Sequence, residues 1–127
     1  QEVGQSLSSF GDGTPAPFLD FDLDGGTFGV RPEALVDTFL HDCPPDIGEE
    51  AMSHLARQSL SVLHQPVRAS AWRHVPSTYL VCAIDRGTPV SAQREFAERA
   101  DNVVEIGAGH HPFLSAPKAM ADLITNL

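Results

Sequence analysis

The C-terminal part of the chain alternates two apolar, β-prone runs with two helical patterns, and this order limits the fold more than any other feature. "TYLVCA" (78–83) is apolar on both faces, and "NVVEI" (102–106) is a second short run. Helical spacing predicts one helix over 91–100 and another from about Ser115. A strand–helix–strand order gives a parallel crossover, and strands that are apolar on both faces are typical of covered parallel sheets. Residues 76–127 therefore predict an α/β fold.

The residues before this segment predict helices and one polar hairpin. "FLDFDLDGGTFGV" (18–30) alternates apolar and acidic residues around a glycine-containing turn, which is typical of a β-hairpin. We expect a short helix from Pro32, because proline suits a first helical turn, and a longer helix from Ile47 to Leu63 that Pro66 follows. Since two parallel strands do not form a stable sheet alone, we expect the chain to be part of something larger.

Composition narrows the classes of partner. The formal net charge is −9 and no Lys/Arg-rich run occurs, which argues against binding to a nucleic-acid backbone. No run of 18 apolar residues is present, so no membrane span is expected, and no signal peptide is apparent. We expect a cytoplasmic protein that binds neither nucleic acid nor membrane.

The two cysteines, Cys43 and Cys82, do not make a disulfide framework. Neither has a CxxC neighbour, so the sequence does not predict a zinc site built on thiolates. Cys82 lies inside the first apolar run, where we expect it to be a small buried hydrophobic residue.

Residues with acid–base chemistry follow both predicted strands. The first strand runs into "AIDRGTPV", which places Asp85 just past its end, and the second runs into "IGAGHH", which places His110 and His111 past its own. The carboxyl ends of parallel strands lie at one edge, where open α/β sheets bind ligands. An aspartate that binds histidine Nδ1–H fixes the tautomer and leaves Nε2 as a general base. Two plainer roles stay open: Asp85 as a turn cap and His110 as an ordinary loop histidine.

These segments resemble a known family. "STYLVCAIDRGTPVSAQREFAERADNVVEIGAGHHPFLSAPKAMADLI" is similar to the end of an α/β-hydrolase, and more narrowly to bacterial forms of the small esterases grouped with plant methyl-ester hydrolases and hydroxynitrile lyases. The D-x-x-x-P of Asp85 to Pro89 matches the loop of the triad acid, and "GAGHHPFLS" matches the histidine loop, with His110 in the catalytic place. "FLHDCPPD" and "ASAWRHVPSTY" resemble the cap helices and the linker from cap to sheet.

The resemblance implies the C-terminal part of an α/β-hydrolase fold, with the last two parallel strands, their flanking helices and a mostly helical cap with a small β-hairpin. Residues 1–13 would be a loop after a sheet strand of a missing half, 14–75 the cap, and 76–127 the part of the core that carries acid and histidine. The family's nucleophile lies in G-x-S-x-G on a strand-to-helix elbow. That motif is absent here, and "GQSLS" (4–8) comes nearest but lacks the last glycine. We therefore expect a cleaved chain, with the serine and the oxyanion hole on a separate N-terminal half.

With that half, the resemblance implies an enzyme that cleaves a small carboxylic ester by Ser-His-Asp acyl transfer and needs no cofactor. His110 would take and return the proton, and Asp85 would orient it. The hydroxynitrile lyases carry a lysine where this chain has His111, and a mostly neutral histidine does not supply that fixed cation, which favours ester hydrolysis. A metal site at Asp85, His110 and His111 is disfavoured, because adjacent residues seldom aim at one ion and no fourth ligand is apparent.

Five residues are candidates for contacts with a substrate, and each also fits a plain packing role. They are His111, Trp72 in the linker, and Phe18, Phe28 and Phe39 in the cap. Two other functions stay open: a non-catalytic ligand-binding or tailoring protein on the same fold, and a lyase or cyclase that uses the triad as a base. The residue at the nucleophile elbow and the turnover of simple aryl esters would separate these functions.

Overall fold

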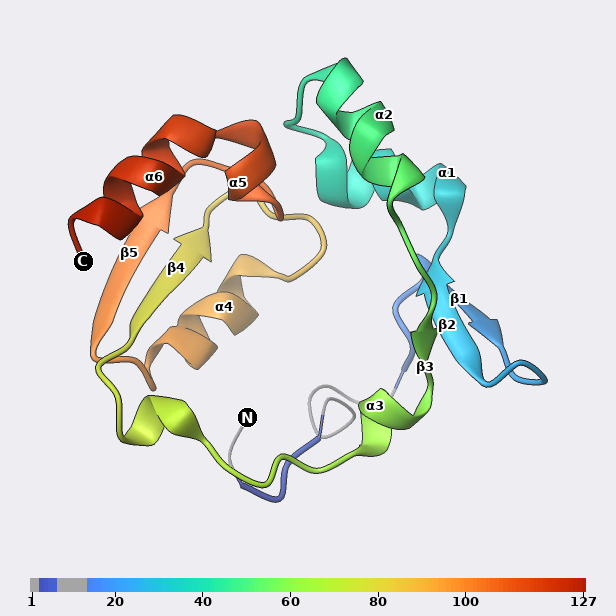
Figure 1. The fold of residues 1–127 in the computed structure, drawn as a ribbon, viewed down its shortest axis with the longest axis horizontal. Coiled ribbons are helices and arrows are strands. Elements are labelled where there is room, and N and C mark those ends of the chain that lie inside the picture. Colours follow the sequence, from blue (N-terminus) through green and yellow to red (C-terminus); the bar gives the residue numbers. More distant parts are fainter. Residues whose placement is uncertain (1–2, 7–13) are drawn as a thin grey trace.

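The computed structural model describes residues 3–6 and 14–127, and a two-stranded parallel sheet organises the C-terminal part (Figure 1). Strand β4 (Thr78–Cys82) pairs with β5 (Asn102–Ile106), so that Leu80 lies opposite Val104. Helix α4 (Val90–Ala97) connects the two strands, which makes the connection a parallel crossover. The predicted α/β class and the parallel pair are confirmed, because both apolar runs form the expected strands.

Two helices follow β5. The short helix α5 (Pro112–Ser115) leads directly into α6 (Pro117–Thr125), and each begins with a proline in its first turn. The sequence predicts only the longer of these helices. The extra turn places Pro112 in a buried position directly after the two histidines.

Residues 14–75, which we call the cap region for brevity, contain the predicted hairpin and a third strand that the sequence did not predict. Strands β1 (Leu19–Asp22) and β2 (Thr27–Val30) pair antiparallel, with Phe21 opposite Phe28. Strand β3 (Gln58–Ser59) adds to the other edge of β2, which gives the order β1-β2-β3.

The single helix expected over 47–63 is wrong. Helix α2 (Pro45–Ser53) ends ten residues earlier, and α3 (Ser61–His64) is a separate turn after β3. After α2 the chain pairs with the hairpin instead of continuing the helix. The guanidinium of Arg57 passes over Gly29 of β2 and donates to Asp20 Oδ2 of β1 at 2.7 Å. Tertiary contacts thus override the helical spacing of the apolar residues.

The core of the cap lies under a helix that changes type. Helix α1 (Pro32–Leu35) continues as the π-helical segment η2 (Val36–Leu40). Leu35, Phe39 and Leu40 form the buried cluster. Leu35 and Phe39 are four positions apart and lie on this one buried face, and the π-helical segment carries Phe39 near its C-terminal end. Short π-helical stretches are rare and often lie at functional sites.

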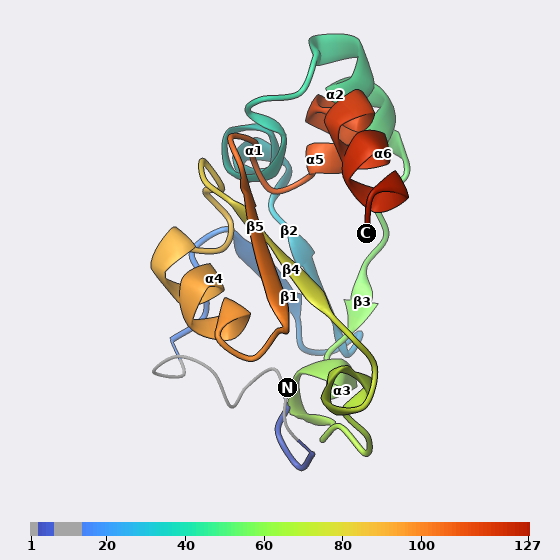
Figure 2. The same ribbon diagram turned by 90° about the vertical axis from the view of Figure 1, so that its left-hand side faces the viewer.

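The parallel sheet is well packed only in part. Val81 of β4 is 1% exposed and Cys82 is buried as predicted, whereas Val103 of β5 is 55% exposed. Helix α4 lies beside the strands in Figure 2, and its most buried residues are Gln93 and Ala97. The apolar residues Ala92, Phe96 and Ala100 are half-buried, because the helix turns the neighbouring face of Gln93 and Ala97 most directly to β4. No residue of α6 is buried, although its apolar spacing predicted a core face.

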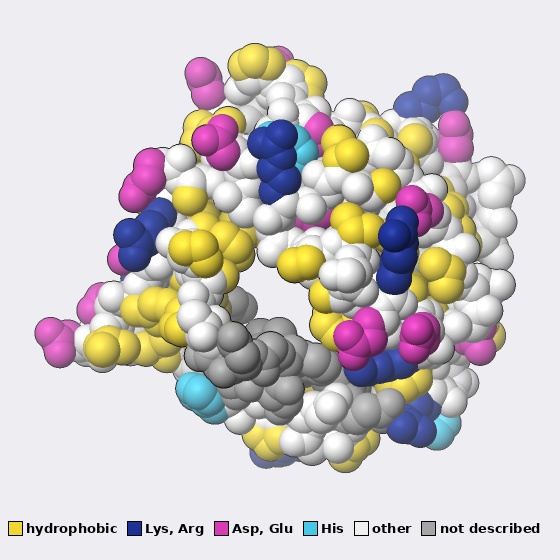
Figure 3. Space-filling model, turned by 180° about the vertical axis from the view of Figure 1, so that it is seen from behind, with side chains coloured by type: hydrophobic (Ala, Val, Ile, Leu, Met, Phe, Trp, Pro, Cys, Tyr) yellow, Lys and Arg dark blue, Asp and Glu magenta, His cyan; other side chains and the backbone are white. Residues whose placement is uncertain are grey.

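The sheet and the cap lie on opposite sides of an opening. The linker through α3 and the 3₁₀ turn η3 (Ala71–Arg73) joins them, and the view from behind shows hydrophobic side chains beside the opening (Figure 3). The expected loop over 1–13 falls outside the described residues except at 3–6. In the part of the chain that is described, no helix combines the length and the apolarity that crossing a bilayer requires.

Candidate active site

Asp85 is held by the turn that follows β4. Its Oδ1 accepts the backbone N–H groups of Gly87 at 2.7 Å and Thr88 at 3.1 Å, and its side chain is 5% exposed. The turn-capping role that the sequence left open is therefore present. The same hydrogen bonds fix the carboxylate at the carboxyl end of β4, so that both of its oxygens remain directed toward the end of β5.

His110 meets this carboxylate from the loop after β5. Its Nδ1 lies 3.0 Å from Asp85 Oδ2 and 3.1 Å from Oδ1, although 25 positions separate the two residues. Because a carboxylate accepts hydrogen bonds, the imidazole donates from Nδ1 and its Nε2 is left to accept a proton. The structure thus brings together the two residues that the sequence placed at one edge of the sheet, and the arrangement can serve as a general base.

Gln93 is a third member of this cluster, and the sequence did not predict it. Gln93 is buried, and its Oε1 accepts the N–H of Cys82 at 2.9 Å. Its Nε2 donates to Asp85 Oδ2 at 3.0 Å and to the carbonyl of Thr88 at 2.9 Å. The amide therefore ties the end of β4, the acid and its turn together. A polar residue four positions before Ala97, on the buried stripe of α4, is the sequence signal that could have indicated it.

Phe39 and Phe18 bring the cap to this cluster. The Phe39 ring packs edge-on against His110, with ring centres 4.8 Å apart, and Phe18 packs edge-on against Phe39 at 5.0 Å. A Cβ atom at Gly87 would lie 2.5 Å from Phe39 Cε1, so the acid turn needs glycine there to admit the ring. Of the four aromatic candidates, Phe39 lies directly against the predicted site, and Phe18 packs on Phe39 behind it.

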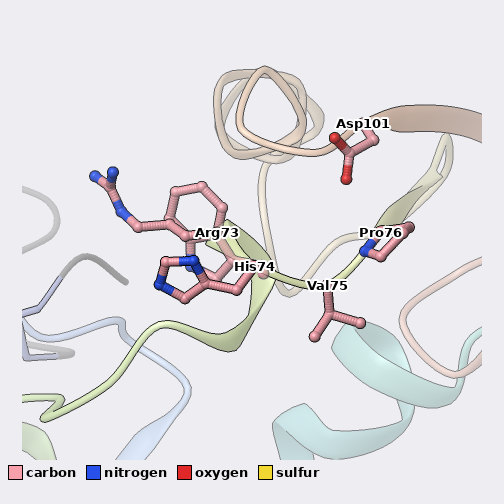
Figure 4. Close-up of a pocket in the computed structure, with 6 residues that line it drawn as sticks. Arg73, His74, Val75, Pro76 and Asp101 are labelled. Atoms are coloured by element: carbon pink, nitrogen blue, oxygen red, sulfur yellow. The ribbon is translucent and has the colours of Figure 1, made fainter.

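Trp72 and Phe28 lie elsewhere. Trp72 belongs to η3, which precedes β4. It lines an open cavity of about 400 Å³ together with Asp101, the residue directly before β5 (Figure 4). That cavity is at the amino ends of the two strands, opposite the edge that carries Asp85 and His110. Phe28 stacks on Phe21 within the hairpin, with ring centres 6.1 Å apart. The structure does not bring either residue to the acid–histidine pair.

His111 is packed among rings at the same edge. It lies edge-on to His110 with ring centres 4.8 Å apart, and it is tilted against Phe113 at 5.3 Å and Phe39 at 6.3 Å. Burial lowers the pKa of His111, and the neighbouring His110 lowers it further. The imidazole of His111 is therefore neutral near pH 7. Within the described residues there is no group of three or more side chains that could hold a metal ion.

The lowered pKa of His111 predicts a loss of stability in acid. The ordinary pKa of 6.5 applies to the unfolded chain, which therefore binds a proton more readily than the folded protein does. The free energy of unfolding should fall as the pH drops below that value, until the folded protein is protonated too. We expect His111→Gln to reduce the difference in unfolding free energy between pH 8 and pH 5, measured by urea titration. His54→Gln, at an exposed histidine, is the matched control, and equal acid losses in the wild type and His111→Gln would contradict the prediction.

Comparison with known proteins identifies a family. Residues 4–123 match the family described as "Alpha/beta hydrolase family". The chain is 29% identical over 128 residues to "Alpha/beta hydrolase nvfD" of Aspergillus novofumigatus, a match that covers 98% of this chain and 51% of that protein. The chain thus spans about half the length of the curated relative that it matches.

Two solved structures show the same fold. A pyrethroid hydrolase from Sphingobium faniae JZ-2 matches with a TM-score of 0.75 and 20% identity, over 98% of this chain and 55% of that one. A polyneuridine aldehyde esterase matches with a TM-score of 0.70 and 23% identity, over 79% of this chain and 42% of that one. On the sequence match over nearly its whole length, this chain belongs to the α/β-hydrolase family.

Proposed function

We propose that this chain supplies the acid and the general base of a serine esterase. The observation that supports this most directly is the contact between His110 Nδ1 and the buried carboxylate of Asp85. In the proposed reaction, Nε2 of His110 takes the proton of a serine hydroxyl while the serine oxygen attacks the ester carbonyl carbon. The carbon–oxygen bond to the alcohol then breaks, and His110 returns the proton to the leaving alcohol. Water, activated in the same way, hydrolyses the acyl-enzyme.

The relatives support an ester as the substrate class. The chain belongs to a hydrolase family, and one of the solved structures with its fold is named an esterase. No step in this chemistry requires a cofactor, because the charge that develops is a carbonyl oxyanion, which backbone N–H groups can bind. Neutral His111 beside His110 fits a substrate that brings no anion to be neutralised. We therefore propose a small, uncharged carboxylic ester, with Phe18, Phe39 and His111 at the wall of its pocket.

The nucleophile and the oxyanion donors belong, in this proposal, to an N-terminal segment. The sequence contains no G-x-S-x-G, and the chain spans about half the length of the relative that it matches. The half-exposed Val103 on β5 and the opening between sheet and cap fit a segment that adds strands and fills this space (Figure 3). Burying apolar area of this kind is the main favourable contribution to such an association.

The test is to identify the nucleophile in the complete protein, in which this chain is combined with that segment. We expect turnover of simple aryl esters, and we expect a fluorophosphonate probe to modify one serine of the N-terminal segment and none of this chain, as read by peptide mass spectrometry. An unreactive complete protein with alanine or glycine at the elbow would instead indicate a binding protein on the same fold.

A further inference from the structure

One short stretch of the cap touches both loops of the candidate site. The carbonyl of Asp37 accepts from the Arg86 guanidinium at 3.2 Å, and Phe39 packs against Gly87 and His110. Asp42 then reaches the histidine loop. The acid turn and the histidine loop, which belong to different strand ends, are therefore held against the same cap segment.

The contact of Asp42 is a hydrogen bond to the backbone directly before the histidine. The N–H of Gly109 donates to Asp42 Oδ2 at 2.6 Å, and 67 positions of sequence separate the two residues. Gly109 is buried, so water does not replace this acceptor freely. A hydrogen bond from a backbone amide to a carboxylate is roughly twice as strong as one between neutral groups, which makes this bond a firm attachment for the loop.

The loop is shaped to receive this carboxylate. A Cβ atom at position 109 would lie 2.5 Å from Asp42 Oδ1 and 2.9 Å from His41 Cε1, so any side chain there would push the cap and the loop apart. Burial alone would raise the pKa of Asp42, but the hydrogen bonds that it accepts, first among them the one from Gly109, outweigh burial and hold the pKa below its ordinary value. Asp42 therefore stays ionised at neutral pH.

We propose that Asp42 is a positioning residue: through the backbone of Gly109, it fixes where the His110 imidazole lies at the carboxyl edge of the sheet. This inference rests on the proposed function, because it gives Asp42 a role through the base of that reaction. Asp42 holds Gly109, Gly109 is bonded to His110, and Asp85 fixes only Nδ1 of the ring. Without the cap carboxylate, the backbone at 109 can shift while the Asp85 contact persists, and Nε2 then moves away from the attacking hydroxyl. A misplacement of about 1 Å can cost about a hundredfold in rate.

The kinetic test compares three variants of the complete protein with an aryl ester. We expect Asp42→Ala to lower kcat by about 10- to 100-fold with KM unchanged, because substrate contacts remain and only the base is misplaced. Asp42→Asn keeps an oxygen that can accept from Gly109 and should retain most of the wild-type kcat. Asp46→Ala, at an exposed aspartate of the same cap, is the matched control and should behave as wild type. Equal losses in all three variants would overturn the proposal.

A second readout needs no substrate. In ¹H–¹⁵N spectra of the complete protein, the Gly109 amide proton should resonate downfield, move upfield in Asp42→Asn and move further in Asp42→Ala. If the wild type cleaves no ester but these shifts occur together with a change at the His110 ring, the esterase proposal fails and the positioning role stands. If Asp42→Ala does not fold, Asp42→Asn decides the matter, and an unchanged Gly109 amide resonance in that variant would overturn the inference.

Discussion

Replacing His110 with alanine is expected to lower kcat of the complete protein for an aryl ester by at least about 10⁴-fold. The imidazole is the group whose Nε2 is free to accept the nucleophile's proton, since Nδ1 is bound to Asp85 at 3.0 Å. His111 is not placed to replace it, because its ring lies edge-on to His110 and makes its contacts with rings. Steady-state kinetics on the purified variant would measure the loss.

His111→Ala is the natural comparison, because it removes an identical side chain one position along the same loop. Its effect on kcat should be far smaller, and its main effect should be on KM if the ring lines the ester pocket. Variants with equal losses of kcat would show that the proton-transfer role is not specific to His110, and the assignment would have to be withdrawn.

The second large effect is expected for Asp85→Asn, which should lower kcat by about 10⁴-fold. The carboxylate accepts from Gly87, Thr88 and Gln93 as well as from His110, so all of its described partners are donors. An amide at this position turns one acceptor oxygen into a donor. The arrangement with fewest conflicts directs the amide N–H toward His110 Nδ1, which then carries no proton. The remaining proton moves to Nε2, the atom that should receive the proton of serine.

Asp101→Asn provides the control for this change. Asp101 Oδ2 accepts from Ser77 N at 2.8 Å and from Ser77 Oγ at 3.2 Å, at the other end of the same sheet. An asparagine oxygen can accept both, and the site lies opposite the acid–histidine pair, so kcat should be unchanged. A small loss for Asp85→Asn, similar to that of Asp101→Asn, would mean that the carboxylate serves only the turn.

The sequence allowed prediction of the sheet and of the acid–histidine pair because both depend on local signals. Each strand is a short apolar run, and the carboxyl ends of parallel strands meet by topology, so Asp85 and His110 could be placed together without knowledge of packing. The end of α2 could not be predicted, because what stops the helix is pairing of 58–59 with β2 and the contact of Arg57 with Asp20. Such pairing depends on a segment about thirty residues away.

The same contrast between local signals and contacts with distant segments applies within the site. Gln93 acts through a hydrogen bond to Asp85 on another element, and Asp42 acts through a hydrogen bond to Gly109, which is distant in the sequence. The identity of a polar residue does not by itself reveal its hydrogen-bond partner. The position of Trp72 in the linker between cap and sheet made it a candidate for substrate contact, but that linker enters the sheet at its amino edge. The order of the sequence assigns Trp72 to the linker, but it does not show whether the linker runs past the amino or the carboxyl edge of the sheet.

The short parallel pair has a practical consequence for handling this protein. Among the described residues, each of β4 and β5 has one neighbour, so each strand presents a second row of backbone N–H and C=O groups that no sheet partner satisfies. Free edges of this kind template the addition of strands from other molecules, and the half-exposed Val103 adds an adhesive apolar surface. Expressed by itself, the chain should self-associate with rising concentration, and co-expression with the complementary segment should suppress that aggregation.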